Sequence, residues 1–295
     1  MATLKLPYGI KRNNLVSIDE VGNGLSCECT CPACGQTLIA RKGDIKIHHF
    51  AHYNSKDCLG GFETALHQMC KEIIFNSKTF ATPPLHFHQT SYEIFEEQII
   101  SVDDVHLEKR LGGIIPDIVI NSKGRQLLVE IVASNPVDEI KLRKIQAANV
   151  GTIVIYAKHL LSNLYLKGDF RLKSPNFQNE IVHGTKYKFW LHNPKLDSLK
   201  CRIKNEFAQK KLIRYFNGDF GKYFFVDNCP LQKRQWRRGL NAGKPFASLD
   251  NDCCQCPFIL GIDHEYNNWD VEVPKMLYCC GHMKSEFRQL IAKLK

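Results

Sequence analysis

Ten of the thirteen cysteines lie in two short stretches near opposite ends of the 295-residue chain. The first stretch contains Cys27, Cys29, Cys31, Cys34 and Cys58, and the second contains Cys253, Cys254, Cys256, Cys279 and Cys280. The N-terminal sequence MATLKLPYGIKRNN lacks the apolar core of a signal peptide, so we expect a cytoplasmic protein. In a reducing compartment clustered cysteines more often bind metal than form disulfides. The clusters therefore predict two metal-stabilised modules.

The first stretch has the spacing of a zinc site. The segment CPACG at 31–35 separates two thiols by two residues, so both can bind one ion, and HHFAH at 48–52 with Cys58 offers the remaining ligands. We predict a closed structural site with four ligands from Cys31, Cys34, His49, His52 and Cys58. His52 is favoured over His49, and the other cysteines of the stretch are weaker candidates. The alternative is a set of core cysteines and exposed histidines.

The second stretch predicts another structural zinc site with a different spacing. Cys253 and Cys256 form one pair, and Cys279 and His282 form a second pair after 22 intervening residues. The adjacent cysteines 254 and 280 are alternatives. Three cysteines, Cys70, Cys201 and Cys229, are left outside both predicted sites.

Residues 62–160 have the pattern of an α/β unit. Apolar periodicity and turn residues predict a helix over 62–75, a β-hairpin over 113–132, a helix over 136–149 capped by Asn135, and a strand over 151–157. Two strand-like pieces follow, at 186–192 and 222–227. We predict four regions: an N-terminal β-hairpin and zinc module at 1–60, an α/β domain at 61–165, a basic connecting region at 166–245 and a C-terminal zinc module at 246–295.

The predicted hairpin places two acids opposite each other. With its turn at Lys123-Gly124, residues whose numbers sum to 247 face one another, and Asp117 and Glu130 form such a pair. Opposed residues have Cβ atoms about 4.5–5.5 Å apart, so two carboxylates there repel unless a cation lies between them. Mg²⁺ typically binds one or two carboxylates together with substrate phosphate. We interpret the pair as a divalent-metal site; an exposed hairpin with two chance acids is the alternative.

The helix predicted over 136–149 directs a lysine toward this pair. Lys141 falls within an apolar stripe that consists of Val137, Ile140, Ile145 and Ala148. A lysine in that position could orient a hydrolytic water or stabilise charge on phosphate. The alternative is a lysine whose ammonium extends past the stripe to solvent.

The helix predicted over 62–75 carries a second set of polar candidates. Glu63, His67 and Lys71 follow one another at intervals of four residues, beside a buried stripe of Phe62, Leu66, Cys70 and Ile73. If this helix packs on the hairpin, Glu63 could complete the metal shell, and His67 or Lys71 could contact phosphate. A solvent-facing ladder of ion pairs is the alternative.

The charge balance favours a polyanionic partner. Lysine and arginine exceed acidic residues by 10, and the pI is about 8.9, which favours nucleic acid first and a membrane surface second. No apolar run approaches the roughly 20 residues of a membrane span, so we expect no membrane association. The segment LQKRQWRRG at 231–239 combines cations with an aromatic ring, which suits phosphate contact and base stacking. Its candidate DNA contacts are Arg234, Trp236, Arg237 and Arg238; a solvated basic turn is the alternative.

Together these motifs resemble a known family. CPACGQTLIARKG, HHFAH, ETALHQMCKEII, PDIVI and LLVEIVAS occur in an order similar to that of the CoiA-like competence-associated proteins. The resemblance covers about residues 1–160. It implies a small zinc-binding module followed by a restriction-endonuclease-like PD-(D/E)XK core, which is an α/β fold with a mixed sheet flanked by helices.

The resemblance also implies an activity and its residues. Asp117 and Glu130 would bind Mg²⁺ or Mn²⁺, Glu63 would be the acid on the helix, and DNA phosphodiesters would be hydrolysed. This superfamily carries lysine or glutamine two residues after the glutamate, where this chain has Val132. We therefore assign the role of the missing lysine to Lys141.

Two functions follow from these assignments. The first is a Mg²⁺- or Mn²⁺-dependent deoxyribonuclease, expected to be an endonuclease, that acts in competence, recombination and repair, or anti-phage defence. The second is a catalytically inactive zinc-containing DNA-binding protein that serves as an adaptor, which Val132 favours. The strandedness of the DNA, exonuclease action, the oligomeric state and the need for a partner ATPase or helicase are left open by the sequence.

Overall fold

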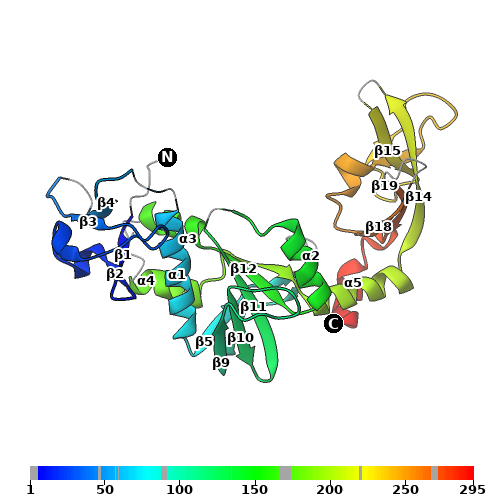
Figure 1. The fold of residues 1–295 in the computed structure, drawn as a ribbon. Coiled ribbons are helices and arrows are strands. Elements are labelled where there is room, and N and C mark those ends of the chain that lie inside the picture. Colours follow the sequence, from blue (N-terminus) through cyan, green and yellow to red (C-terminus); the bar gives the residue numbers. More distant parts are fainter. Residues whose placement is uncertain are drawn as a thin grey trace. The chain divides into compact units, whose positions relative to one another are not determined.

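The computed structural model describes residues 6–45, 48–56, 58, 60–87, 92–133, 135–166, 174–218, 221–266 and 272–295. The chain forms two compact units, which are shown with their elements in Figure 1. Unit 1 comprises residues 1–83 and 97–193, and unit 2 comprises residues 84–96 and 194–295. The predicted connecting region at 166–245 is therefore divided between the two units after Asn193.

Unit 1 begins with two small hairpins. The first pairs β1 (Tyr8–Lys11) with β2 (Asn14–Ser17), and the second pairs β3 (Leu38–Arg41) with β4 (His49–His52). The short 3₁₀ turns η1 (Ile18–Glu20) and η2 (Leu25–Cys27) lie between the hairpins in sequence. Cys27, Cys29, Cys31 and Cys34 lie between the two hairpins in sequence, and Cys58 follows the second.

A five-stranded mixed sheet forms the centre of unit 1. Its strand order is β13-β12-β11-β10-β9, with β11 and β12 parallel and the other neighbours antiparallel. The strands are β9 (Asp104–Leu107), β10 (Ile118–Ser122), β11 (Arg125–Val132), β12 (Thr152–Tyr156) and β13 (Lys188–His192). A separate antiparallel pair is formed by β5 (Thr79–Thr82) and β8 (Gln98–Ser101). The mixed α/β class is confirmed, as are the predicted hairpin and its following strand.

Helices cover both faces of this sheet because the side chains of a strand alternate between its faces. Ile118 and Val129 belong to the large core that also contains Leu66 of α1 (Gly61–Phe75). Val119 and Leu128 instead form a smaller core with Ile145 of α2 (Glu139–Ala148). Unit 1 also contains α3 (Ala157–Leu166) and α4 (Pro175–Val182).

The N-terminal hairpins share the large core with the sheet. Tyr8, Leu38 and Phe50 are buried in the same cluster of side chains as Leu66 and Ile118. The predicted boundary between residues 60 and 61 therefore does not separate two cores. The N-terminal hairpins and the α/β sheet form one folded body.

The second predicted helix starts later than the sequence suggested. The Asp138 side chain, rather than Asn135, caps α2 by accepting a hydrogen bond from the backbone N–H of Lys141. The predicted apolar stripe is wrong in part, because Ile140 is 70% exposed and Ala148 is exposed. The helix faces the sheet with Ile145, and Lys141 is half-buried beside it.

Unit 2 is built on a six-stranded sheet of order β16-β17-β15-β14-β19-β18. Its elements in chain order are β6 (Leu85–His86), β7 (Glu93–Phe95), α5 (Pro194–Glu206), β14 (Gln209–Gly218), β15 (Gly221–Asp227), β16 (Arg234–Gln235), β17 (Pro245–Ser248), the π-helical turn η3 (Leu249–Cys253), β18 (Ile259–Tyr266), β19 (Glu272–Cys279), the 3₁₀ turn η4 (Gly281–Met283) and α6 (Phe287–Leu294). The β6–β7 segment comes from a distant part of the chain. Its Phe87 and Tyr92 rings pack against Phe287 of α6 with centroid distances of 5.3 and 5.4 Å. Residues 84–96, which were predicted to lie in the α/β domain at 61–165, therefore belong to unit 2.

Candidate functional site

Four metal-ligand side chains converge in the N-terminal module. The ligand atoms of Cys31, Cys34, His52 and Cys58 all lie within 4.8 Å of one another. Within the described residues no other set of three or more cysteine, histidine or acidic ligand atoms is this compact. These are the four ligands that the sequence favoured. Two thiols from one tight turn, one histidine and a third thiol match the donor set of a structural zinc site, so the cluster could hold Zn²⁺.

The surroundings of the cysteine turn shift the pKa values of its two thiols in opposite directions. The backbone N–H of Gln36 and the His52 side chain, which lies 3.2 Å from the Cys34 Sγ, together lower the pKa of Cys34 to about 7. Burial raises the pKa of Cys31 to about 11, and its Sγ lies 3.6 Å from that of Cys58. A cation would favour the thiolate forms of these closely spaced sulfurs, because metal ligation requires deprotonated cysteine.

The neighbouring cysteines and histidine have other positions. Cys27 and Cys29 are buried and donate to the backbone carbonyls of Leu38 and Cys27, respectively. His49 is buried on β4 and is not a member of the converging set. The converging set therefore contains His52, which the sequence favoured, and not His49.

The metal-ligand cluster adjoins the start of α1. A Cβ placed on Gly61, the first residue of this helix, would lie 3.2 Å from the Cys31 Sγ and 3.5 Å from the Cys58 Sγ. Glycine leaves room for the sulfurs, and the positive end of the helix dipole stabilises thiolates near it. Because α1 also carries His67 and Lys71, the cluster anchors the helix that reaches the second candidate site.

The predicted register of the acidic hairpin is confirmed. Ile118 pairs with Val129 and Ser122 with Arg125, so paired residue numbers sum to 247. Lys123 and Gly124 have positive φ angles of 48° and 73°, as a two-residue hairpin turn requires. Asp117 directly precedes β10 and Glu130 lies near the end of β11, so the two acids occupy neighbouring positions at the end of the hairpin.

Asp117 is surrounded by hydrogen-bond donors. Its Oδ2 accepts from the backbone N–H of Ile131 at 2.8 Å and lies 2.9 Å from Nε2 of His67. Lys71 Nζ lies 3.6 Å from the other carboxylate oxygen and 2.7 Å from Glu108. Burial raises the pKa of Asp117, but the His67, Ile131 and Lys71 contacts outweigh it and hold this pKa below its ordinary value. His67 and Lys71 therefore face the acidic site and do not form a solvent ladder.

Glu130 has the opposite electrostatic environment. Burial and, to a smaller extent, the adjacent Asp117 carboxylate raise the pKa of Glu130 to about 7, although the hydrogen bond from Lys141 opposes the increase. The Lys141 Nζ lies 2.6 Å from Oε2. The other oxygen, Oε1, is buried and has no hydrogen-bond partner among the described residues. A buried carboxylate oxygen without a partner is costly, so the site suits a bound cation.

The third predicted acid is directed elsewhere. Glu63 lies 3.7 Å from Lys158 of α3 and does not form a compact three-acid set with Asp117 and Glu130 in the described structure. Its role in a metal shell stays a prediction. Val132, at the position where the motif carries lysine, is 7% exposed, while Lys141 reaches Glu130 from α2. The predicted proximity of Lys141 to the acids is confirmed.

The raised pKa of Glu130 makes a prediction about stability. Between about pH 4.5 and pH 7 the native state retains a proton that the unfolded state releases, so Glu130 lowers the free energy of unfolding as the pH rises through this window. Glu130→Gln removes this contribution. We therefore expect the stability of this variant to increase relative to wild type from pH 5 to pH 8, measured by urea denaturation without divalent metal. Glu72→Gln, at an exposed position of α1, is the control, and a pH-independent difference for Glu130→Gln would contradict the assignment.

The basic segment of unit 2 lies beside an aromatic cluster. Trp236 stacks on Phe246 with ring centroids 4.1 Å apart and contacts the edge of Phe225. Arg237 and Arg238 are exposed. Arg234 forms an ion pair with Asp252 at 2.6 Å, which gives this predicted DNA contact a partner within the protein.

The adjoining strands carry an exposed aromatic pair that was not predicted from the sequence. Phe216 of β14 and Tyr223 of β15 are cross-strand partners with stacked rings 5.2 Å apart, and they remain 46% and 42% exposed. Phe216 also contacts Phe225 and Trp236, so these rings share one face. Aromatic residues on both sides of residue 218 could have indicated this pair. They gave no clear sign of a binding face, because aromatic residues are common in ordinary strands.

The second cysteine stretch lies in unit 2. Cys253, Cys256 and Cys279 line one cavity, whereas His282 lies in η4 with an exposed side chain. His282, predicted as the fourth zinc ligand beside these three cysteines, is not among the residues that line the cavity.

The fold and sites define an α/β protein with an N-terminal cysteine-histidine metal module and an acidic hairpin. Residues 19–60 match the family described as the N-terminal domain of competence protein CoiA. This range includes all four residues of the converging cluster, so the similarity concerns the metal module. No curated protein and no solved structure matches the chain. Among the described residues, no helix is long and apolar enough to cross a membrane.

Proposed function

We propose that unit 1 is a metal-dependent nuclease whose catalytic centre contains Asp117 and Glu130. The observation that carries this proposal is the buried, unpartnered Oε1 of Glu130 beside a second carboxylate. Two neighbouring acids suit a divalent cation, because carboxylate oxygens are the ligands that Mg²⁺ and Mn²⁺ prefer. Bound there, Mg²⁺ or Mn²⁺ would polarise a phosphoryl group and help to generate the attacking hydroxide.

The surrounding cations would act on the phosphodiester and its charge. The ammonium of Lys141, held at Glu130, would orient the hydrolytic water or stabilise negative charge that develops on the phosphoryl oxygens. His67 and Lys71 hold Asp117 in its ionised form. Lys71 is almost fully buried and therefore positions the carboxylate, whereas His67 is accessible enough to contact phosphate.

Two further observations support DNA as the substrate. The chain carries a net charge of +10, which favours binding to a phosphate backbone. The aromatic face of unit 2 offers sequence-independent stacking to unpaired bases. The match of residues 19–60 to a competence-protein domain favours a role in the processing of incoming DNA; recombination, repair and anti-phage defence use the same chemistry.

A second candidate function is DNA binding without cleavage. It is favoured by the ion pairs that already engage the two lysines at the site, Lys141 with Glu130 and Lys71 with Glu108, and by Val132 at the motif position of lysine. In that case the chain would be an adaptor that holds DNA for a partner enzyme such as an ATPase or helicase.

One assay separates the two functions. The purified full chain is incubated with supercoiled, linear and single-stranded DNA in Mg²⁺, Mn²⁺ or EDTA, and binding is measured on the same DNA in parallel. A nuclease cleaves in Mg²⁺ or Mn²⁺ but not in EDTA, and Asp117→Asn abolishes cleavage while binding is retained. Binding without cleavage under all conditions would support the adaptor.

The aromatic pair of unit 2 makes a separate prediction. Phe216→Ala and Tyr223→Ala are each expected to weaken binding of single-stranded DNA by about tenfold, because base stacking on one ring contributes about 1–3 kcal/mol. Fluorescence anisotropy with a labelled oligonucleotide would measure the loss. Tyr215→Ala is the matched control: Tyr215 is 53% exposed, but it neighbours Phe216 on the same strand and so points to the opposite face. Equal losses in all three variants would contradict a stacking face.

A further inference from the structure

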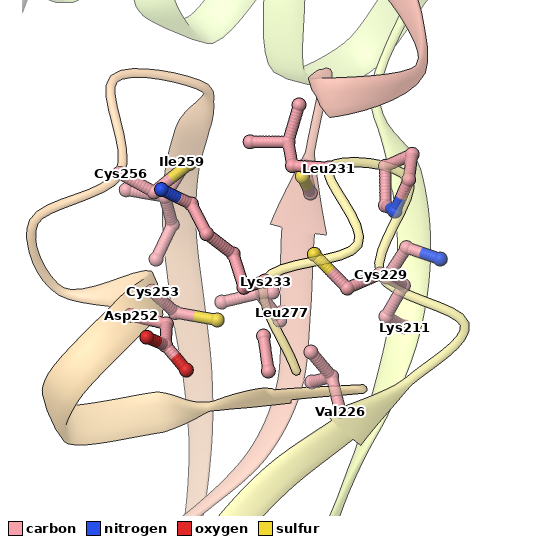
Figure 2. Close-up of a pocket in the computed structure, with 13 residues that line it drawn as sticks. Lys211, Val226, Cys229, Leu231, Lys233, Asp252, Cys253, Cys256, Ile259 and Leu277 are labelled. Atoms are coloured by element: carbon pink, nitrogen blue, oxygen red, sulfur yellow. The ribbon is translucent and has the colours of Figure 1, made fainter. Parts of the chain in front are cut away.

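A small cavity in unit 2 is lined by four cysteines from three separate segments. Cys229 follows β15, Cys253 ends η3, Cys256 lies three residues further on, and Cys279 ends β19. Figure 2 shows the sulfurs of Cys229 and Cys253 pointing into this cavity. All four are free thiols, and three of them are buried.

We infer that Cys229, Cys253, Cys256 and Cys279 form a second structural zinc site, with Cys229 in the place that the sequence assigned to His282. Four thiolates are a common complete ligand set for structural zinc. The inference concerns unit 2 alone and does not depend on nuclease activity.

The turns around these cysteines have the local geometry of zinc-binding loops. The Gly281 N–H donates to the Sγ of Cys279 at 3.2 Å, and the Phe258 N–H donates to the Cys256 sulfur. In each case the donor is the amide two residues after the cysteine. The Gln36 N–H donates to Cys34 in the same way in the first cluster. Such bonds stabilise a thiolate and direct its sulfur toward a shared ion.

Cys229 is held at the cavity by close packing of its own segment. A Cβ on Gly281 would lie 2.9 Å from Pro230 and 3.3 Å from the Cys279 sulfur, so the segment after Cys229 packs tightly on the Cys279 turn. Cys229, Cys256 and Cys279 each add to the effect of burial in raising the pKa of Cys253 to about 12, as expected for neighbouring thiols. Zinc binding would deprotonate all four.

The size and charge of the cavity favour one metal ion. Its volume is about 20 Å³, enough for a water-sized particle and therefore for a single metal ion. Four thiolates around Zn²⁺ carry a net charge of −2, and the cavity lining includes Lys211 and Lys233. Both lysines lie close enough to lower the pKa of a cavity cysteine, Lys211 that of Cys279 and Lys233 that of Cys256. The two positive charges of these lysines would balance the net charge of −2 on the zinc site.

The four sulfurs must move closer together to bind zinc. Within the described residues only the first cluster brings its ligand atoms within 4.8 Å of one another. Zn–S bonds of about 2.3 Å would place tetrahedral sulfurs about 3.8 Å apart.

Metal analysis of purified full-length variants tests the assignment. Wild type is expected to contain two zinc ions per chain, Cys229→Ser one, and His282→Ala two. Cys254→Ser, an exposed neighbour outside the cavity lining, is expected to retain two. Two zinc ions in Cys229→Ser, or one in His282→Ala, would overturn the proposal, as would iron in place of zinc.

Cobalt spectroscopy keeps the test decisive if Cys229→Ser does not fold. In a Cys34→Ser background, Co²⁺ loads the second site alone, and its sulfur-to-cobalt charge-transfer absorption reports the number of thiolates. We expect a four-thiolate spectrum that His282→Ala leaves unchanged, and a three-thiolate spectrum in Cys229→His. A three-thiolate spectrum in the parent that changes on His282→Ala would assign the fourth ligand to His282 and overturn the proposal.

Discussion

Glu130→Gln is expected to reduce metal-dependent DNA cleavage by about a hundredfold or more. The substitution keeps the size of the side chain but removes one of the two anionic ligands. A catalytic metal supplies several kcal/mol of transition-state stabilisation, and each 1.4 kcal/mol corresponds to about tenfold in rate. The measurement is the initial rate of cleavage of a labelled DNA in Mg²⁺ and in Mn²⁺, at saturating DNA.

The stability measurements on this variant make the result interpretable. Because Glu130→Gln removes a buried carboxylate with a raised pKa, the variant remains folded, and lost activity then reports on chemistry. Lys141→Met is the companion variant, since it removes the ammonium while it keeps most of the side-chain length. Wild-type cleavage by Glu130→Gln would exclude this hairpin as the catalytic centre.

Cys34→Ser is expected to remove one zinc ion per chain and to loosen the N-terminal module. Cys34 is the exposed member of the cluster, so serine replaces its thiol without a cavity in the core. Structural zinc contributes about 10–16 kcal/mol in zinc-finger peptides, so the loss of one of four ligands removes much of the support for the module. Zinc content, thermal unfolding and limited proteolysis of residues 6–58 measure these effects.

The same variant tests whether the metal module supports the acidic site. Gly61 joins α1 to the cluster sulfurs, and α1 carries His67 against Asp117. We therefore expect a loss of DNA cleavage together with the loss of zinc. Cys201→Ser, at an exposed cysteine outside both sites, is the control and should keep both properties. Full zinc content in Cys34→Ser would contradict the assignment of the cluster.

Local patterns predicted the N-terminal metal site and the acidic hairpin well. The ligands of the first cluster lie in a tight turn, one strand and one loop, so their spacing already limits the possible set. The hairpin register follows from the position of a two-residue turn, because one turn fixes every pair along both strands. Helix periodicity also directed Lys141 toward the sheet, although two members of the predicted stripe, Ile140 and Ala148, are exposed.

Long-range packing could not be predicted in the same way. Nothing in the sequence around Cys229 resembles a metal-binding motif, since it is a single cysteine 24 residues before the next one. It lies at the cavity through tertiary structure: β15, which precedes Cys229, pairs antiparallel with β17, which precedes Cys253. Similarly, Glu63 has the helical spacing to reach the acids, but the position of α3 gives it Lys158 as a partner.

The path of the chain has a consequence for fragments of this protein. Unit 2 is discontinuous in sequence: the chain enters it at residue 84, leaves it after residue 96 and returns at residue 194. A fragment of residues 194–295 lacks Phe87 and Tyr92 and would expose the Phe287 surface that they cover. A chain truncated before residue 229 also separates β15 from its partner strand β17. Likewise, a single recombination crossover between residues 96 and 194 would transfer most of unit 2 without the short segment that completes its core. A single crossover can therefore transfer all of unit 2 only together with residues 97–193 of unit 1.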